Sequence, residues 1–62
     1  MKELMRTGEI AARLGVSLPT VRRLLRAYDV PVFVLQQAWR VRKEDAERFI
    51  EAVLSNAPKS LG

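Results

Sequence analysis

The chain contains neither cysteine nor histidine, and this constrains its fold more than any other feature of the sequence. Disulfides and ordinary Cys/His zinc sites, which stabilise many small domains, are excluded, and no cofactor is expected. Because a chain of 62 residues buries only about 60% of the surface that its unfolded form exposes, apolar packing must stabilise one small domain. Hydrophobic residues make up 48% of the chain, which is enough for a globular core.

Positive charge is concentrated in the first two thirds of the chain. Residues 1 to 43 carry nine basic and three acidic side chains, whereas residues 44 to 62 carry two and four. Most of the basic residues are arginines, which suit bidentate contacts with phosphate and guanine. The charge predicts a polyanionic partner, although composition alone does not separate nucleic acid from an anionic membrane or an acidic protein.

No segment of the sequence has the pattern of an export signal or a membrane span. The first residues include Lys2 and Glu3 and lack the apolar run of a secretory signal. The longest apolar run, residues 30 to 35, is too short to cross a bilayer. We therefore expect a domain that acts in the cytoplasm and does not contact membranes.

Two short helices are predicted at the start of the chain, separated by Gly15. Thr7 is expected to cap the first helix, and Gly15 to end it in a left-handed conformation. Ser17 is expected to cap the second helix by accepting the amide of Thr20, with Pro19 in the first turn, where a missing N–H costs little.

The second predicted helix, residues 17 to about 27, has two contrasting sides. The inward side combines Val21, Leu24, Leu25 and Tyr28. The opposite side combines Pro19, Arg22, Arg23 and Arg26, with Thr20 at its border. Because this helix contains no acidic residue to pair with its arginines, the pattern favours binding of a polyanion over an ordinary solvated surface.

After Pro31, the sequence predicts a β-hairpin and a closing amphipathic helix. The strands are residues 32 to 35 and 38 to 41, with Gln36 and Gln37 as the turn, and the helix spans residues 43 to 54. Residues 55 to 62 are expected to form a frayed tail. The aromatic residues expected in the core are Tyr28, Phe33, Trp39 and Phe49.

The apolar run of residues 30 to 35 exceeds what a hairpin can bury. Only one side of a two-stranded hairpin packs inward, so either Val32 and Val34 or Phe33 and Leu35 should face away from the core. The remaining apolar surface is either ordinary exposed valine or an edge for self-association, at which neighbouring copies or a partner domain dock.

Two stretches of the chain resemble a known family. The stretch TGEIAARLGVSLPTVRRLL, Thr7 to Leu25, resembles a helix-turn-helix, with small Ala11 where two helices approach and Gly15 four residues later. The segment WRVRKEDAERFI, Trp39 to Ile50, resembles the wing and last helix of the excisionase and MerR-type winged-helix group. The resemblance implies a mainly α fold with a small β-hairpin, in the order α-α-β-β-α. Its domain would span residues 7 to 54, after an extension of residues 1 to 6.

Domains of this group place the second helix in the major groove and the wing against the adjacent minor groove or backbone. The resemblance thus implies that Arg22 and Arg23 read base edges, that Arg26 contacts phosphate and that Arg40 is a wing contact. The candidate DNA-contacting residues are Ser17, Pro19, Thr20, Arg22, Arg23, Arg26, Gln37, Arg40 and Arg42. The effector domain of MerR regulators is not matched, so no small-molecule effector is expected.

The function predicted from the sequence is sequence-specific binding of double-stranded DNA, by a small transcriptional regulator or an excisionase-like architectural factor that directs recombination. The alternative is a helix-turn-helix protein-interaction module, such as an antitoxin or the N-terminal adaptor of a larger recombinase or regulator. Catalysis is not expected, because the acidic residues of the last helix follow helix-dipole and side-chain pairing rules.

Overall fold

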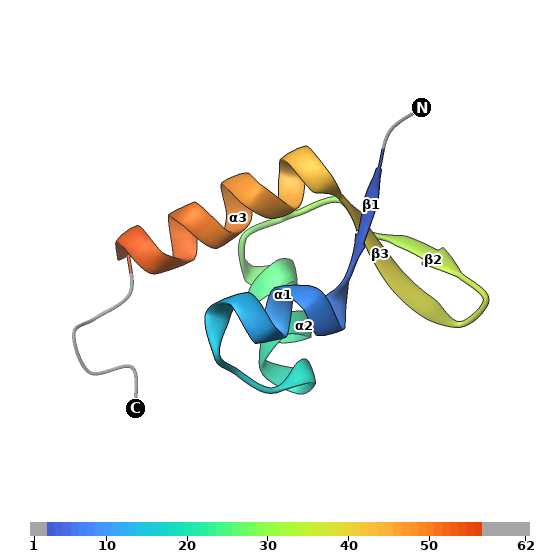
Figure 1. Ribbon diagram of the computed structural model, residues 1–62, viewed down its shortest axis with the longest axis horizontal. Helices are drawn as coiled ribbons and strands as arrows, with labels where there is room; N and C mark the ends of the chain where they lie inside the picture. The colour runs from blue at the N-terminus through green and yellow to red at the C-terminus, as the bar shows by residue number, and fades with distance from the viewer. Residues whose placement is uncertain (1–2, 57–62) are drawn as a thin grey trace.

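The structure, a computed structural model, describes residues 3 to 56. The elements in chain order are β1 (Leu4–Arg6), α1 (Thr7–Leu14), α2 (Leu18–Ala27), β2 (Phe33–Leu35), β3 (Ala38–Arg42) and α3 (Lys43–Asn56). Figure 1 shows α1 and α2 together on one side of α3, with the β2–β3 hairpin projecting away from the helices. The predicted fold class, mainly α with a small β-hairpin, is confirmed.

Strand β1 is an element that the sequence does not predict. It pairs antiparallel with β3, which becomes the central strand of a sheet with the order β1-β3-β2. Met5 lies opposite Val41, and the backbone N–H of Lys43 donates to the carbonyl of Glu3 at 2.9 Å. An exposed ion pair joins the same two residues, Lys43 Nζ and Glu3 Oε1, at 3.3 Å. The three residues before α1, Leu4–Arg6, are therefore part of the sheet.

Because β1 continues to Arg6, the predicted cap at Thr7 is wrong. Arg6 occupies the N-cap position with extended backbone, and its N–H donates to Glu9 Oε1 at 2.9 Å. Thr7 is instead the first helical residue and is buried. The carboxylate of Glu9 thus satisfies the backbone at the start of α1, where a negative charge is also favoured by the helix dipole.

The turn between α1 and α2 has the predicted geometry. Gly15 adopts φ 72°, and the N–H groups of Gly15 and Val16 both donate to the carbonyl of Ala11, at 2.7 and 3.1 Å. Ser17 Oγ accepts the N–H of Thr20 at 3.4 Å and lies 2.9 Å from its hydroxyl. These contacts end α1 and start α2 within three residues, which fixes the direction in which α2 leaves the turn.

The core lies where α1, α2, α3 and the central strand meet. Its buried residues are Ile10, Ala11, Val21, Leu25, Val41, Ala46, Phe49, Ile50 and Val53. Val21 and Leu25 are fully buried and Leu24 packs against the core, which confirms the inward side predicted for α2 except at Tyr28, which is exposed. The opposite side of α2 is therefore turned to solvent.

Two of the four aromatic residues expected in the core lie outside it. Phe49 is buried as predicted, and Trp39 packs partly against the core, but Tyr28 and Phe33 are 38% and 37% exposed. Tyr28 follows the last turn of α2, where its ring meets the ring of Phe49 in an edge-to-face contact. Phe33 pairs with Arg40, and side chains alternate along a strand, so Phe33 lies on the sheet face turned away from buried Val41.

The hairpin buries less apolar surface than the alternation predicts. All three residues of β2 are exposed, and Val34 is 63% exposed although it lies on the core-facing side, opposite Trp39. The reason is position, since the hairpin extends beyond the helices (Figure 1).

Helix α3 continues through Ser55 and Asn56, past its predicted end. The rest of the predicted tail, residues 57 to 62, lies outside the described residues.

Candidate nucleic-acid interface

Three arginines of α2 form an exposed, positively charged surface, here called the arginine face. Arg22, Arg23 and Arg26 are all exposed, on the side of the helix opposite Val21 and Leu25. Within residues 3 to 56, none of their guanidinium groups forms an ion pair with a carboxylate. Their charge is therefore available to a ligand in solution.

Trp39 links the arginine face to the hairpin. The guanidinium carbons of Arg22 and Arg26 each lie 5.4 Å from the centre of the Trp39 ring, within the range of a cation–π interaction. Trp39 alternates with Arg40 and shares the core-facing side of β3 with Val41, which directs its ring toward α2. The helix and the hairpin therefore present one continuous surface, which a groove-binding ligand could meet with both elements at once.

The remaining arginines of β3 lie on the other face of the sheet. Arg40 Nη1 donates to the carbonyl of Trp39 at 3.2 Å, and both Arg40 and Arg42 are partly buried. The guanidinium carbon of Arg42 lies 5.4 Å from the ring centre of Phe33. Both side chains are thus held against the hairpin, which lowers the conformational entropy that a ligand contact would cost.

The two turn residues of the hairpin both adopt left-handed backbone. Gln36 has φ 50° and Gln37 has φ 65°, the geometry that a two-residue type I′ turn requires. Both side chains are exposed at the tip of the hairpin. Gln37, a candidate contact, is therefore placed at the end of the wing-like projection seen in Figure 1.

An open hollow lies between the starts of α1 and α2 and the hairpin, and we call it the α1–hairpin hollow. The side chains with charged or polar groups that line it include Arg6, Glu9, Arg22, Gln37 and Arg40. It brings together candidate residues from α2, the turn and β3. Leu18, at the start of α2, also lines the hollow, and its neighbours in sequence are the N-cap Ser17 and the first-turn residues Pro19 and Thr20. Thr20 is partly buried.

Two residues of this surface were missed by the sequence analysis, Arg6 and Trp39. Arg6 precedes the resemblance to a helix-turn-helix, and only its pairing with Arg40 across β1 and β3 places it at the hollow. Trp39 was predicted as a core residue, and its aromatic face gives no sequence signal for the arginines that contact it. Both depend on contacts between distant parts of the chain.

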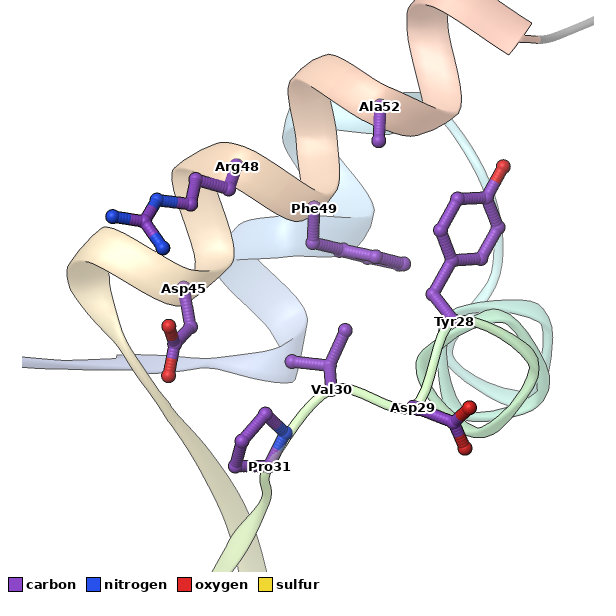
Figure 2. Close-up of a pocket in the computed structure, with 8 residues that line it drawn as sticks. All are labelled: Tyr28, Asp29, Val30, Pro31, Asp45, Arg48, Phe49 and Ala52. Carbon is purple, nitrogen blue, oxygen red and sulfur yellow. The ribbon is translucent and has the colours of Figure 1, made fainter.

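A second, shallow hollow lies between the segment after α2 and helix α3. Tyr28, Val30, Pro31, Phe49 and Ala52 form its apolar lining. Figure 2 shows the ring of Phe49 pointing toward the ring of Tyr28, with Val30 below Phe49. Its charged residues are Asp29, Asp45 and Arg48. None of the candidate DNA-contacting residues lines it, so it is separate from the arginine face.

The described residues show neither a group of metal-ligating side chains nor a membrane-spanning helix. From residue 3 to residue 56, no group of three acidic side chains is arranged to hold a metal ion. In the same part of the chain, no helix is both long enough and apolar enough to cross a bilayer.

Comparison with known proteins gives a family. No curated protein and no solved structure matches the chain significantly. The family described as the helix-turn-helix domain matches residues 4 to 53, which include every strand and most of α3. The match also includes β1, so the added strand falls within the family's own boundaries. Since most of the sequence is matched, the chain belongs to the helix-turn-helix domain family.

Proposed function

We propose that the domain binds double-stranded DNA sequence-specifically, with α2 in the major groove and the hairpin against the adjacent minor groove or backbone. Family membership supplies DNA as the partner, and domains of this kind are typically not enzymes. The observation that carries the proposal is the arginine face, three exposed arginines without acidic partners in the described residues, on the helix that follows the turn. Arginine pairs with guanine edges through two hydrogen bonds.

The arginines have different surroundings, which supports different roles. Arg23 is exposed and is not among the arginines that contact Trp39, so we assign base reading to Arg23. Arg26, held beside the hairpin by Trp39, is assigned to phosphate as the sequence suggested. Arg22 has the same restraint and borders the α1–hairpin hollow, which favours a phosphate contact over the base contact first expected.

The remaining candidate contacts belong to the two ends of this surface. Ser17, Pro19 and Thr20 form the start of α2, where backbone amides and hydroxyl groups suit a phosphate. Gln37, Arg40 and Arg42 belong to the hairpin. We propose that they position the wing on the DNA rather than read its sequence.

The biological role that we propose is that of a small transcriptional regulator or an excisionase-like architectural factor, acting in the cytoplasm at the nucleoid. The support is the resemblance of residues 39 to 50 to the wing and last helix of excisionase and MerR-type domains. Selection of bound sequences from a random duplex pool would identify the operator.

The test of DNA binding is a titration of labelled duplex at low and moderate salt. Phosphate contacts make affinity fall steeply as salt rises. Arg23→Ala should cost about 1 to 3 kcal/mol on the selected site and relax base preference. The matched control is Arg48→Ala, which removes the same charge from α3, beside the second hollow.

Two results would contradict the proposal. Equal losses for the Arg23 and Arg48 variants would show that only net charge matters. The absence of salt-sensitive binding at micromolar protein would favour the other function considered, a helix-turn-helix protein-interaction module such as an antitoxin or a recombinase adaptor.

We also propose that neighbouring copies associate on multi-site DNA along the edge formed by residues 30 to 35. Val30 and Val32 pack against the core, which leaves the exposed strand β2 as the available part. It is an outer strand of the sheet, so one side of its backbone is open to a second copy. Val34→Lys should reduce cooperativity on multi-site DNA without changing affinity for a single site. Unchanged cooperativity would dismiss this association.

A further inference from the structure

Arg6 and Arg40 lie directly opposite each other on β1 and β3. Side chains in such a pair extend to the same face of the sheet, with Cβ atoms about 4.5 to 5.5 Å apart, and like charges in this arrangement destabilise the fold. Within the described residues, neither guanidinium group forms an ion pair that would offset the repulsion. The free protein therefore carries two arginines at directly opposed positions on one face of the sheet, an arrangement that disfavours the fold.

A third arginine borders the same place. Arg6, Arg40 and Arg22 come from β1, β3 and α2, and all three line the α1–hairpin hollow. Glu9 also lines it, but one oxygen of its carboxylate accepts the N–H of Arg6 at 2.9 Å. The residues that line the hollow thus include three arginines and one glutamate, and the carboxylate of that glutamate already accepts a backbone N–H.

Two of the three guanidinium groups are restrained before any ligand binds. Arg40 donates to the carbonyl of Trp39 at 3.2 Å, and Arg22 lies 5.4 Å from the centre of the Trp39 ring. Groups that are already oriented lose less conformational entropy on binding. An anion in the hollow would meet a prepared set of donors and would also relieve the repulsion between Arg6 and Arg40.

We propose that the α1–hairpin hollow binds a phosphate group of the DNA backbone, at the point where the strand passes from α2 to the hairpin, with Arg6 as a contact. This inference rests on the proposed DNA binding. Guanidinium groups form short, charge-assisted hydrogen bonds with phosphate oxygens. A phosphate contact positions the protein without reading sequence, so the site contributes affinity on every duplex.

The test uses Arg6→Gln in the full chain, with Arg48→Gln as the charge-matched control. The hydrogen bond from the backbone N–H of residue 6 to the Glu9 carboxylate does not involve the Arg6 side chain, so the variant should fold. Its melting temperature without DNA should be equal to or higher than that of the wild type. Its affinity should fall by a similar factor on selected and random duplexes, and the slope of log K against log salt should become shallower by about 0.9.

Two outcomes would overturn the phosphate site. One is a salt slope for Arg6→Gln that equals that of the wild type and of Arg48→Gln. The other is a loss confined to the selected sequence, because that would make Arg6 a base contact instead.

Sulfate supplies a measurement that does not depend on DNA. Sodium sulfate should raise the melting temperature of the wild type more than that of Arg6→Gln, relative to sodium chloride at equal ionic strength. If the wild type binds no duplex but shows this difference, the proposed function is wrong and DNA is not the ligand of this anion site. If the wild type binds duplex but sulfate acts equally on both proteins and the salt slopes agree, the phosphate site alone is wrong.

Discussion

The ring of Tyr28 meets the ring of Phe49 edge to face, with centroids 5.6 Å apart and planes at 85°. This contact joins the end of α2 to the middle of α3, across the hollow drawn in Figure 2. Its two members differ in burial, since Phe49 is 3% exposed and Tyr28 is 38% exposed. The pair is therefore anchored in the core at one end and open to solvent at the other.

This difference predicts unequal losses of stability. Phe49→Ala should lower the free energy of unfolding by about 3 to 5 kcal/mol, because it empties a buried site. Tyr28→Ala should cost clearly less, and Tyr28→Phe less again, because it keeps the ring. Urea denaturation followed by circular dichroism measures all three. Equal losses for the two alanine variants would show that the exposed ring contributes as much as the buried one.

The hairpin turn should be open to stabilisation. Gln36 and Gln37 both hold φ above zero, where residues with a Cβ are disfavoured by about 1 to 2 kcal/mol. Asn-Gly at these two positions suits the turn and should raise the melting temperature. The control is Ala-Ala, which keeps the strain and should not raise it. A melting temperature for Asn-Gly no higher than for Ala-Ala would mean that the turn is not left-handed in solution.

Asp29 is a second strained position, at the end of α2. It has φ 55°, its N–H donates to the carbonyl of Arg26 at 3.1 Å, and the N–H of Val30 donates to that of Leu25 at 3.0 Å. In this pattern of hydrogen bonds the left-handed residue that ends the helix is usually glycine. A carboxylate at this position is also unfavourable, because the C-terminal end of a helix carries partial negative charge. Asp29→Gly should therefore stabilise the domain by up to about 1 kcal/mol.

Ala27→Gly is the matched control for Asp29→Gly, two residues earlier. Ala27 is exposed and helical, so glycine there should destabilise by about 0.5 to 1 kcal/mol. The two glycine substitutions should thus shift thermal unfolding in opposite directions. A shift of the same sign in both would argue that the left-handed conformation of Asp29 carries no strain.

Trp39 should influence DNA binding through the arginines that it contacts. Trp39→Leu removes the aromatic face beneath Arg22 and Arg26, whereas Trp39→Phe keeps one. We expect weaker DNA binding for the leucine variant than for the phenylalanine variant, and a loss of the ring-current shifts of the two arginine side chains in NMR spectra. Equal affinities for both variants would mean that the ring does not orient the arginines.

The parts of the fold that follow local rules could be predicted from the sequence. Gly15 ends α1 and Ser17 caps α2 because each acts on backbone groups within a few residues. The exposed arginine face follows from helical periodicity between Arg22 and Arg26. In each case the cause and its effect lie within one turn of helix.

The parts that depend on distant contacts could not be predicted. Three residues, Leu4–Arg6, carry no periodicity, and they form a strand only because β3 lies beside them. Because β1 ends at Arg6, Arg6 takes the N-cap position of α1, and Thr7, the expected cap, is the first residue of the helix. The exposure of Phe33 and the contacts of Trp39 likewise depend on which side of β3 faces α2.

In the described residues, three of the four positive φ angles belong to Asp29, Gln36 and Gln37 rather than to glycine. Natural chains rarely sit at their optimum of stability, and these positions leave a reserve that can be recovered without touching the arginine face. A parent protein carrying Asp29→Gly and Gln36→Asn would tolerate damaging substitutions elsewhere. Lost DNA affinity in such a background could then be separated from lost folding.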